Sequence, residues 1–488
     1  MPKTATAHKS GPKVRVSKAS EVKKPRRRRI TFPDYHSALK YLTERVDIER
    51  TRPSRIDPKV FKLDRMRYML EAMGNPHESL RCVHVAGTNG KGSIVAMTTS
   101  CLRKCGYTVG AYTSPHLTDV RERIAINGQL ISYHAFRDVM GQVATAAASL
   151  PPRLGEPTFF EVITAAAFAH FADQAVDVAV IEVGLGGRLD STNVIIPEVA
   201  AVGSIGLDHT QILGDTVEKI AAQKAGIFKK GVPALTFQQE SKVLEAMRTV
   251  AAEVGAPLQV VGQDIEFSYR FEASQQLGPH TRVGLSTERC SFEHLPVPLP
   301  GEHQAFNCGL VLAIIDSLVE RGFELPESKV MAGLEETVVP GRMEMAWKSP
   351  RVLLDGAHNP PAMTALMKTI GAHVPYDSLI VIFGCAADKD VDEMLRRLSL
   401  GADKVLFTRV KNNPRAADPR DLHRRFVDLA GKMSQVCETL EDALATAVKA
   451  AGRDDLVCIT GSFYLVGEAK RLLAEREQQK ASGRVEKA

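Results

Sequence analysis

The 488-residue sequence lacks the features that mark several classes of protein. None of its apolar runs approaches the ~18 residues that a membrane-spanning helix needs, which argues against a transmembrane protein. Its eight cysteines include no Cys-x-x-Cys pair, and most stand inside apolar runs. That distribution argues against a disulfide scaffold and predicts buried free thiols in a reducing cytoplasm. With 44% hydrophobic residues, 25% charged residues and one tryptophan, the composition is that of a globular protein.

The charge is unevenly distributed along the chain. The formal net charge is +6, yet residues 1–30 contain eleven Lys and Arg against one acid, leaving 52 basic and 56 acidic residues in the rest, a net charge of −4. The body of the protein therefore gives no reason to expect nucleic-acid binding. Residues 1–32 have too few aromatic and branched apolar side chains to form a core, so we expect a disordered basic tail. A solvated extension is favoured over an arm that touches RNA or acidic surfaces and over a targeting sequence.

The central feature of the sequence is Gly87-Thr-Asn-Gly-Lys-Gly-Ser93. It follows an apolar run, Cys82 to Ala86, and precedes apolar residues at helical spacing, so we expect the glycines at a strand-to-helix turn. Glycines let backbone N–H groups approach phosphate oxygens, the helix N-terminus adds partial positive charge, and Lys91 adds a full one. Two residues, not the usual four, separate the first glycine from the Gly-Lys pair. The pattern predicts a phosphate-binding loop, with a plain glycine-rich turn as the weaker alternative.

Three expected strands end in polar residues: 108–112 before Ser114, 177–183 with Glu182, and 200–207 before His209. Near-continuous apolar strands that alternate with helices predict a mainly parallel sheet covered on both faces, with ligands beyond the carboxyl ends of the strands. We therefore expect these three side chains at one edge, together with Ser93. A hydroxyl, a carboxylate and an imidazole beside a phosphate loop favour a magnesium site over a salt-bridged acid and a surface histidine.

The alternation of strands and helices restarts after residue 338. Expected strands at 351–354, 379–383, 404–407 and 456–460 indicate a second, smaller α/β domain. The predicted fold class is α/β, a P-loop-type mainly parallel sheet followed by a Rossmann-like domain with a cleft between them. The predicted units are the tail at 1–32, a domain with the phosphate loop at 33–338 and a C-terminal domain at 339–488. Arg342, at the junction, is placed to reach phosphates, although a plain interdomain salt bridge explains it equally well.

Lys224 stands on an expected helix among alanines. Such a lysine is ordinarily a surface residue whose stem covers apolar side chains. Apolar surroundings can, however, lower the pKa of a lysine and make its neutral amine reactive. The residues alone do not choose between these two interpretations.

Nine segments together resemble the bacterial folylpolyglutamate synthase and dihydrofolate synthase family, within the class of ATP-dependent Mur-type amide ligases. The resemblance covers about Tyr41 to Leu473 and follows the family's order: Ala86–Ser93, Thr113–Leu117, Thr158–Glu161, Glu182–Asp190, Leu207–His209, Lys224–Phe228, Pro340–Arg342, Asp355–Asn359 and Gly461–Phe463. The glycine loop alone is shared by the wider class of Mur-type ligases, whereas the nine segments together are specific for this family. Two positions depart from the family pattern: Gln223 replaces a glutamate before Lys224, and Lys62-Leu-Asp-Arg65 replaces Gly-Leu-x-Arg.

The resemblance implies roles for individual residues of this sequence. The ATP-binding residues would be Gly90, Lys91, Gly92, Ser93, Asn307, Arg342 and Asp355. The magnesium ligands would be Ser114, Glu182 and His209, and the substrate-binding residues would be Thr158, Phe159, Phe160, Glu161, Leu189, Asp190 and Ser191. The catalytic residues would be Lys91, His209 and Lys224, with Lys224 N-carboxylated to an anionic carbamate.

The implied activity is that of an acid–amino-acid ligase. It would add L-glutamate to dihydropteroate, to folate polyglutamates or to both, through an acyl phosphate made from ATP, with Mg²⁺ as cofactor. We expect a cytoplasmic monomer without membrane or nucleic-acid partners. Three alternatives stay open. One is another Mur-type ligase that acts on a cell-wall precursor, and one is a non-enzymatic nucleotide-binding or RNA-binding protein, which the basic tail suggests. The third is a degenerate ligase, which Gln223 suggests, although the intact Lys91 and Lys224 argue against it.

Overall fold

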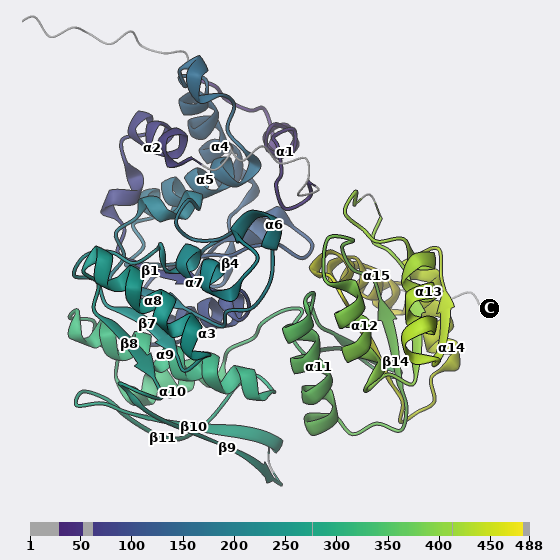
Figure 1. Ribbon diagram of the computed structural model, residues 1–488. Coiled ribbons are helices and arrows are strands. Elements are labelled where there is room, and N and C mark those ends of the chain that lie inside the picture. Colours follow the sequence, from purple (N-terminus) through teal and green to yellow (C-terminus); the bar gives the residue numbers. More distant parts are fainter. Residues whose placement is uncertain (1–28, 52–61, 276, 412, 482–488) are drawn as a thin grey trace, which may run out of the picture.

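The computed structural model describes residues 29–51, 62–275, 277–411 and 413–481. They form an N-terminal domain, from α1 to α10, and a C-terminal domain, from β12 to α15 (Figure 1). Residues of both domains line a cleft between them. Most of the predicted tail, residues 1–28, lies outside the described residues. The last residues of that tail contact the N-terminal domain, where Ile30 N donates to Thr145 Oγ1 at 2.8 Å and Phe32 packs against Tyr41.

An eight-stranded sheet with the order β4-β3-β2-β5-β1-β6-β7-β8 forms the centre of the N-terminal domain. Its strands are β1 (Cys82–Ala86), β2 (Val109–Tyr112), β3 (Ile124–Ile126), β4 (Gln129–Leu130), β5 (Val178–Glu182), β6 (Val199–Val202), β7 (Ala234–Phe237) and β8 (Leu258–Val261). The six strands from β2 to β8 in this order are parallel, and β3 and β4 extend the sheet in antiparallel orientation. Because β1 lies inside the sheet, the glycine loop that follows it emerges in the middle of the carboxyl edge.

Helices cover both faces of this sheet, which is why its inner strands are mostly apolar. One face packs against α3 (Lys91–Lys104), α9 (Glu302–Glu320) and α10 (Glu327–Glu335). The other face packs against α1 (Tyr35–Thr43), α2 (Leu63–Ala72), α4 (Tyr133–Ala147), α5 (Phe159–Asp173), α7 (Val217–Ala225) and α8 (Ser241–Val254). Short turns join them: α6 (Thr210–Leu213), η3 (Pro76–Ser79), η4 (Val120–Arg123), η5 (Pro152–Leu154) and η6 (Ser191–Val194).

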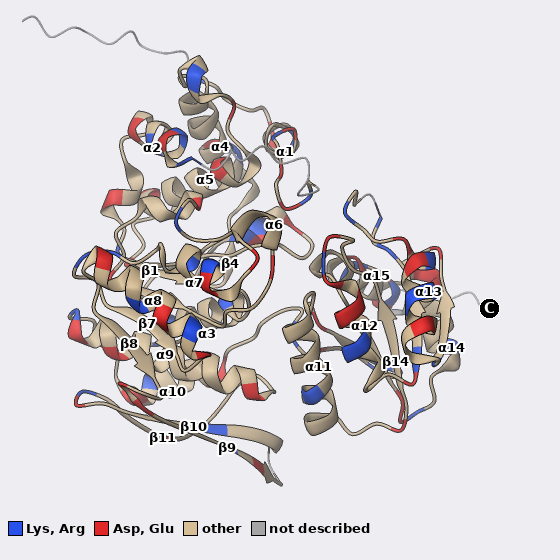
Figure 2. Ribbon diagram, viewed as in Figure 1, with Lys and Arg blue, Asp and Glu red and all other residues tan. Residues whose placement is uncertain are grey.

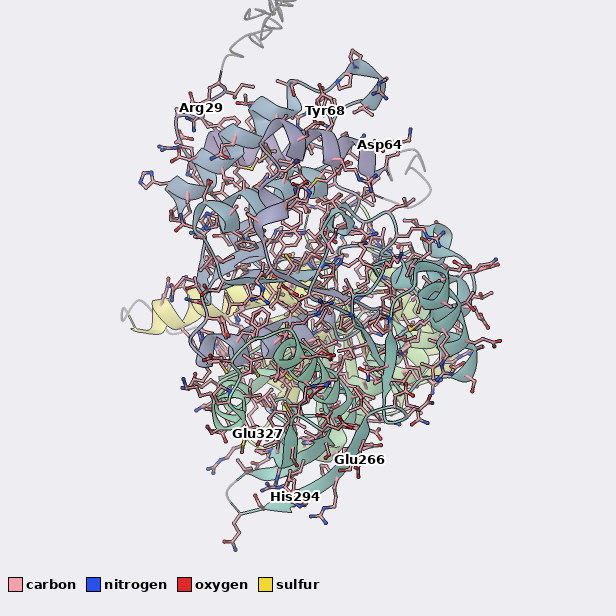
Figure 3. The ribbon with its side chains drawn as sticks, turned by 90° about the vertical axis from the view of Figure 1, so that its left-hand side faces the viewer. Arg29, Asp64, Tyr68, Glu266, His294 and Glu327 are labelled. Carbon is pink, nitrogen blue, oxygen red and sulfur yellow. The ribbon has the colours of Figure 1, made fainter. Side chains whose placement is uncertain are left out.

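A three-stranded antiparallel sheet packs on the outside of α9 (Figure 1). Its strands are β9 (Glu266–Ser274), β10 (Gly278–Ser286) and β11 (Ser291–Pro296), in the order β11-β10-β9. This sheet is the β-rich segment that the sequence predicts between 256 and 300. Seen from the side, Glu266, His294 and Glu327 lie at one end of the molecule, and Arg29, Asp64 and Tyr68 lie at the opposite end (Figure 3).

The C-terminal domain contains a six-stranded sheet with the order β12-β13-β17-β14-β15-β16. Its strands are β12 (Glu344–Lys348), β13 (Arg351–Leu354), β14 (Leu379–Phe383), β15 (Lys404–Phe407), β16 (Met433–Val436) and β17 (Leu456–Thr460), all parallel except β12. One face packs against α11 (Pro360–His373), α12 (Val391–Ser399) and α13 (Pro419–Ala430), and the other against α14 (Leu440–Ala450) and α15 (Phe463–Ala481). On α12 and α13, acidic and basic side chains are interspersed (Figure 2).

The α/β class and the mainly parallel sheets predicted from the sequence are confirmed. The strand expected at 200–207 is shorter, Val199–Val202, because the carbonyl oxygen of Ser204 leaves the sheet and accepts Thr88 N of the glycine loop at 2.7 Å. All eight cysteines are free, and every one except the half-buried Cys105 is buried. Within the described ranges, no helix is both long enough and apolar enough to cross a membrane.

Candidate active site

The predicted phosphate loop joins the carboxyl end of β1 to the N-terminus of α3. Gly90 caps α3 with a φ of 86°, a left-handed conformation that favours glycine. A side chain at Gly90 would also collide with Asn307 Oδ1 of α9. Asn307 Nδ2 donates to Gln304 Oε1 at 2.9 Å, and Gln304 Nε2 donates to Ser93 Oγ at 3.3 Å. Helix α9 therefore holds the loop through Gln304, and Asn307, which the resemblance assigns to ATP, supports Gln304 and packs against Gly90.

Two lysines converge on one carbonyl oxygen of this loop. Lys91 Nζ donates to Gly87 O at 3.1 Å, and Lys224 Nζ donates to the same oxygen at 3.0 Å. Burial lowers the pKa of Lys224 to about 7, and the positive charge of Lys91 adds to this effect. The structure therefore supports the reactive interpretation of Lys224, since about half of the molecules with an amine of this pKa carry it in the neutral form at pH 7.

Ser114 and Glu182 lie side by side at the ends of β2 and β5. Ser114 N donates to Glu182 Oε2 at 3.2 Å. Burial raises the pKa of Glu182 to about 7, although the positive charge of Lys91 works against this effect. Nearby positive charges and hydrogen bonds only partly offset the cost of burying this carboxylate, so a bound cation would stabilise its ionised form.

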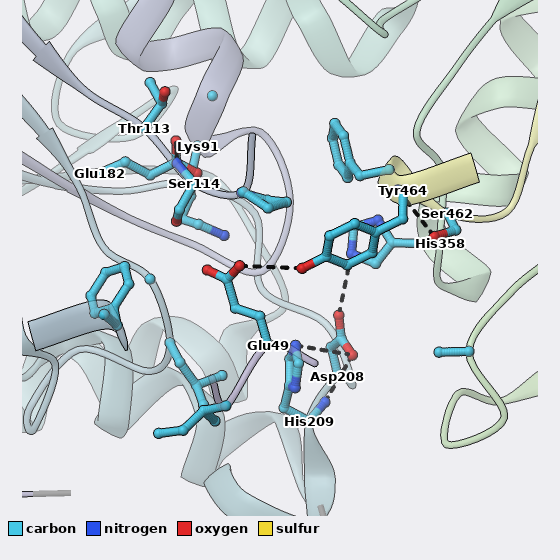
Figure 4. Close-up of a pocket in the computed structure, with 18 of the residues that line it drawn as sticks. Glu49, Lys91, Thr113, Ser114, Glu182, Asp208, His209, His358, Ser462 and Tyr464 are labelled. Carbon is cyan, nitrogen blue, oxygen red and sulfur yellow. Dashed lines mark hydrogen bonds and ion pairs between the residues drawn. The ribbon is translucent and has the colours of Figure 1, made fainter. Parts of the chain in front are cut away.

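His209 lies beside Asp208 and, in Figure 4, apart from Ser114 and Glu182. Burial lowers the pKa of His209 to about 3, so its imidazole is neutral, which is the form that binds metals. The described residues contain no group of three His, Cys, Asp or Glu side chains arranged to hold a metal ion. The predicted magnesium ligands are thus a Ser–Glu pair and a separate histidine, which would need phosphate oxygens or a further anion to complete an oxygen-rich shell.

The C-terminal domain brings Arg342 and Asp355 to the cleft from its own side. The guanidinium of Arg342 lies over the ring of Phe463, 4.3 Å from its centroid. Asp355 follows β13, and its carboxylate accepts Met343 N at 3.0 Å and Ala357 N at 2.9 Å. Arg342 lines the cleft, so a phosphate on the loop would have cations on both sides.

The residues predicted to bind the pterin have structural partners of their own. Thr158 and Glu161 form a reciprocal capping box at the start of α5, with Thr158 N donating to Glu161 Oε2 at 2.8 Å. Arg65 Nε also donates to both oxygens of Glu161, at 2.9 and 2.8 Å. The ring of Phe160 fills the space that a side chain at residue 184 would need, so Gly184 allows that ring to lie there.

The cleft between the domains has a volume of about 600 Å³. Most of the predicted site residues line it: Gly90, Lys91, Gly92, Ser114, Thr158, Phe160, Glu161, Glu182, Leu189, Asp190, Ser191, His209, Lys224 and Arg342. Four others are buried behind the surface of the cleft: Ser93, Phe159, Asn307 and Asp355.

Sequence reasoning missed the charged side chains that cross the cleft. Lys389 forms an ion pair with Asp208, and Asn359 Nδ2 donates to Asp208 Oδ2 at 3.2 Å. Glu49 accepts hydrogen bonds from Arg123 of the N-terminal domain. Lys389 follows β14 and so obeys the strand-end rule already applied to Glu182 and His209, whereas Glu49 carries no comparable signal.

Two family models match the chain. One describes the Mur ligase middle domain and matches residues 85–315. The other describes the Mur ligase glutamate ligase domain and matches residues 341–463. One match falls in the N-terminal domain and the other in the C-terminal domain, on the two sides of the cleft.

Curated relatives and solved structures agree with these matches. The dihydrofolate synthase/folylpolyglutamate synthase of Bacillus subtilis is 34% identical over 414 residues, 84% of this chain and 94% of that protein. Its namesake from Mycobacterium tuberculosis is 34% identical over 480 residues, 92% and 96% of the two chains. The structure of E. coli FolC in complex with DHPP and ADP has a TM-score of 0.79 at 30% identity, covering 91% and 98% of the two chains. The chain therefore belongs to the folylpolyglutamate synthase/dihydrofolate synthase family of Mur ligases.

Proposed function

We propose that the interdomain cleft is where this chain joins L-glutamate to a folate-type carboxylate with ATP, and that both dihydropteroate and folate polyglutamates serve as acceptors. ATP-dependent addition of glutamate to folates is the activity of the family to which the chain belongs. The observation that carries the placement is the meeting of Lys91 from one domain and Arg342 from the other at the same cleft.

The reaction needs activation because a carboxylate does not condense with an amine in water. The acceptor carboxylate attacks the γ-phosphorus of ATP, which gives an acyl phosphate and ADP. The amine of glutamate then attacks the acyl carbon, forms the amide and releases phosphate. No protein nucleophile is required, so the residues act by positioning and by stabilising charge.

The proposed ATP site combines loop, helix and C-terminal domain. Lys91 and the N-terminal amides of α3, from Gly90 to Ser93, would bind the phosphates. Arg342 would stabilise the charge that develops on the γ-phosphoryl group from the opposite side. Asn307 and Asp355, buried next to the cleft, would contact other parts of the nucleotide.

Ser114 and Glu182 would bind one magnesium ion, and His209 would help to hold a second. Mg²⁺ held by these residues would supply positive charge that offsets the negative charge of the ATP phosphates. The buried and poorly compensated carboxylate of Glu182 fits such a cation.

Lys224 would carry the carbamate, which would supply an anionic ligand group in addition to His209 for the second metal ion. The neutral amine attacks CO₂, forms an N–C bond and loses one proton, and its pKa of about 7 favours this reaction near neutrality. The carbamate should appear as a new carbon resonance when the protein is incubated with ¹³C-labelled bicarbonate, and it should be absent from Lys224→Met.

On the acceptor side, the pterin would lie against Phe160 and Leu189, which line the cleft. Thr158, Phe159, Glu161, Asp190 and Ser191 would shape this wall, and the bonds between Thr158, Glu161 and Arg65 would hold it in place. We further propose the domain limits 33–338 and 339–488 and a monomeric cytoplasmic protein. The free cysteines are consistent with a reducing compartment.

Parallel assays test this function. The purified protein receives ATP, Mg²⁺ and glutamate with either dihydropteroate or tetrahydrofolate, and the product masses and released phosphate are measured. Glutamylated product from both acceptors is the expected result. Product from a single acceptor would refute bifunctionality, and turnover with neither would refute the proposed folate specificity.

A further inference from the structure

Glu49 lies in the cleft, on the segment that follows α1 (Figure 4). Its carboxylate accepts two hydrogen bonds from Arg123, at 2.9 Å from Nη1 and 2.5 Å from Nη2. Burial would raise the pKa of Glu49, but the Arg123 guanidinium overcomes this effect and holds the pKa below its usual value. The cleft thus contains an anionic side chain to which the proposed reaction gives no role.

Arg123 connects Glu49 to the loop that carries Ser114. The Arg123 side chain is fully buried, and its Nε donates to His116 Nδ1 at 2.9 Å. A buried guanidinium needs a carboxylate partner, because an unpaired charge in the interior is costly. A displacement of Glu49 would therefore disturb Arg123 and, through it, the Ser114 loop.

The C-terminal domain holds Glu49 from the opposite side. Tyr464, in the first turn of α15, donates its hydroxyl to Glu49 Oε2 at 3.4 Å, as Figure 4 shows. Arg415 Nη1 donates to the Glu49 carbonyl oxygen at 2.5 Å, and Asp388 fixes Arg415 through two bonds of 3.0 and 2.6 Å. One residue of the N-terminal domain is thus bound to the C-terminal domain through both its side chain and its main chain.

A second charged contact crosses the same cleft. Lys389 forms an ion pair with Asp208, the residue before His209. The C-terminal domain therefore reaches both segments that carry predicted metal ligands. It contacts the His209 segment through Lys389, and it reaches the Ser114 loop both directly, where α15 packs on Leu117, and through Glu49 and Arg123.

We propose that Glu49 is a positioning residue for the ligase reaction, which couples docking of the C-terminal domain to the placement of the Ser114 loop. The inference rests on the ligase function proposed above. Glu49 touches no reacting atom in this role and acts through Arg123 and Tyr464. Through these contacts Glu49 keeps the two domains docked, and the cleft closed, while the acyl phosphate is present.

The two fates of an acyl phosphate make this role measurable. Attack by the amine of glutamate forms the C–N bond of the product and releases phosphate. Attack by water forms a C–O bond, returns the acceptor carboxylate and releases the same phosphate. The ratio of phosphate released to amide formed is therefore one when closure excludes water, and it rises when closure fails.

The experiment measures this ratio in single reactions of wild type, Glu49→Gln, Tyr464→Phe and Glu44→Gln. Glu49→Gln keeps the size of the side chain but removes the charge that binds Arg123, and Tyr464→Phe removes one hydroxyl. Glu44→Gln is the matched control, because Glu44 is exposed on the same segment and pairs only loosely with Lys40, at 3.8 Å. We expect the ratio to rise by about fivefold or more in Glu49→Gln, as the loss of a charge-assisted hydrogen bond predicts, less in Tyr464→Phe and not at all in Glu44→Gln.

A purely structural role would lower stability and kcat but leave the ratio at one, and that result in folded Glu49→Gln would overturn the inference. Tyr464→Phe carries the test if Glu49→Gln does not fold. The double variant Glu49→Gln/Tyr464→Phe should show the same ratio of phosphate to amide as Glu49→Gln alone. Additive effects on this ratio would show that Tyr464 acts independently of Glu49 and would contradict the coupling. Absence of any product from wild type would instead refute the proposed function.

Discussion

Lys91 and Lys224 donate hydrogen bonds to the same carbonyl oxygen, that of Gly87, at 3.1 and 3.0 Å. Two ammonium groups that share one acceptor repel each other, and both also resist burial when charged. Conversion of one of them to a neutral or anionic group relieves this repulsion. The structure thereby gives a physical reason for a reactive lysine beside a phosphate loop.

Replacement of Lys224 by Met should abolish most activity yet stabilise the fold. We expect turnover to fall by about 10²-fold or more, as for other losses of a positioned electrostatic group. The free energy of unfolding in CO₂-free buffer should rise, because burial lowers the pKa of Lys224 from 10.5 to about 7 and each unit corresponds to about 1.4 kcal/mol. Denaturant titration measures the stability, and Lys219→Met, an exposed change on the same helix, is the control that should alter neither quantity strongly.

The gain in stability of Lys224→Met over wild type should depend on pH. Unfolded Lys224 keeps its proton up to about pH 10.5, whereas the folded residue loses it above about pH 7. The unfolded state therefore binds more protons between these values, and the stability of wild type rises with pH across this window relative to Lys224→Met. Unfolding curves at pH 7, 8 and 9 test this, and a constant difference between the two proteins would contradict the buried, neutral lysine.

Magnesium affinity should increase with pH through the ionisation of Glu182. Burial raises the pKa of this carboxyl to about 7, so at pH 6 the cation must displace a proton and at pH 8 it need not. Calorimetric Mg²⁺ titrations of the ADP complex at both pH values should show tighter binding at pH 8. Glu182→Gln should lose this dependence and its Mg²⁺-stimulated turnover, whereas Glu253→Gln, an exposed change on α8, should retain both.

Addition of a single methyl group to Gly467 should disrupt the interface between the domains. A Cβ at this position of α15 would overlap the carbonyl oxygen of Leu117, which lies in the Ser114 loop. We expect Gly467→Ala to lower kcat by about tenfold or more, since small misplacements of reacting groups have effects of this size. Gly371→Ala is the matched control, because Gly371 of α11 faces open space and the helix should gain up to about 1 kcal/mol. Equal activity of the two variants would show that this contact does not constrain the loop.

Glu161 should matter more for stability than for acceptor binding. Its carboxylate is bound by Arg65 and by the Thr158 cap, so Glu161→Leu removes the anion that balances the charge of the buried Arg65, at a cost of about 3 to 5 kcal/mol. The double variant Arg65→Met/Glu161→Leu should recover most of that loss. Thermal unfolding measures the stabilities. The KM of the double variant for the acceptor measures whether Glu161 contacts the acceptor directly. A large rise in KM without a loss of stability in Glu161→Leu would favour direct contact with the pterin.

The features that the sequence predicted well are local ones. The loop from Gly87 to Ser93 and the strand-end positions of Ser114 and Glu182 follow from apolar periodicity and the parallel-sheet rule, which need only neighbouring residues. The pattern Thr158-x-x-Glu161 also contained a local signal, that of a capping box, and this signal points to a helix start rather than to a ligand contact.

The features that the sequence did not predict depend on contacts between distant residues. Asp208 pairs with Lys389, which lies 181 residues away, and Glu49 reaches Tyr464 across 415 residues. Such pairs depend on how two separately folded sheets face each other, and no periodicity within one element encodes that relationship. His209 stands at a predicted strand end, yet its separation from Ser114 and Glu182 also became visible only in three dimensions (Figure 4).

The reactivity of the free cysteines can report where the folded protein opens locally. Cys105 is half-buried and should react with a thiol reagent in the folded protein, and Cys385, although buried, lines the cleft. All seven cysteines other than Cys105 are buried and should react mainly when their surroundings open. Four of these lie in the N-terminal domain, Cys82, Cys101, Cys290 and Cys308, and three in the C-terminal domain, Cys385, Cys437 and Cys458. Pulse labelling followed by peptide mass analysis would therefore reveal which domain loosens first, without a single engineered residue.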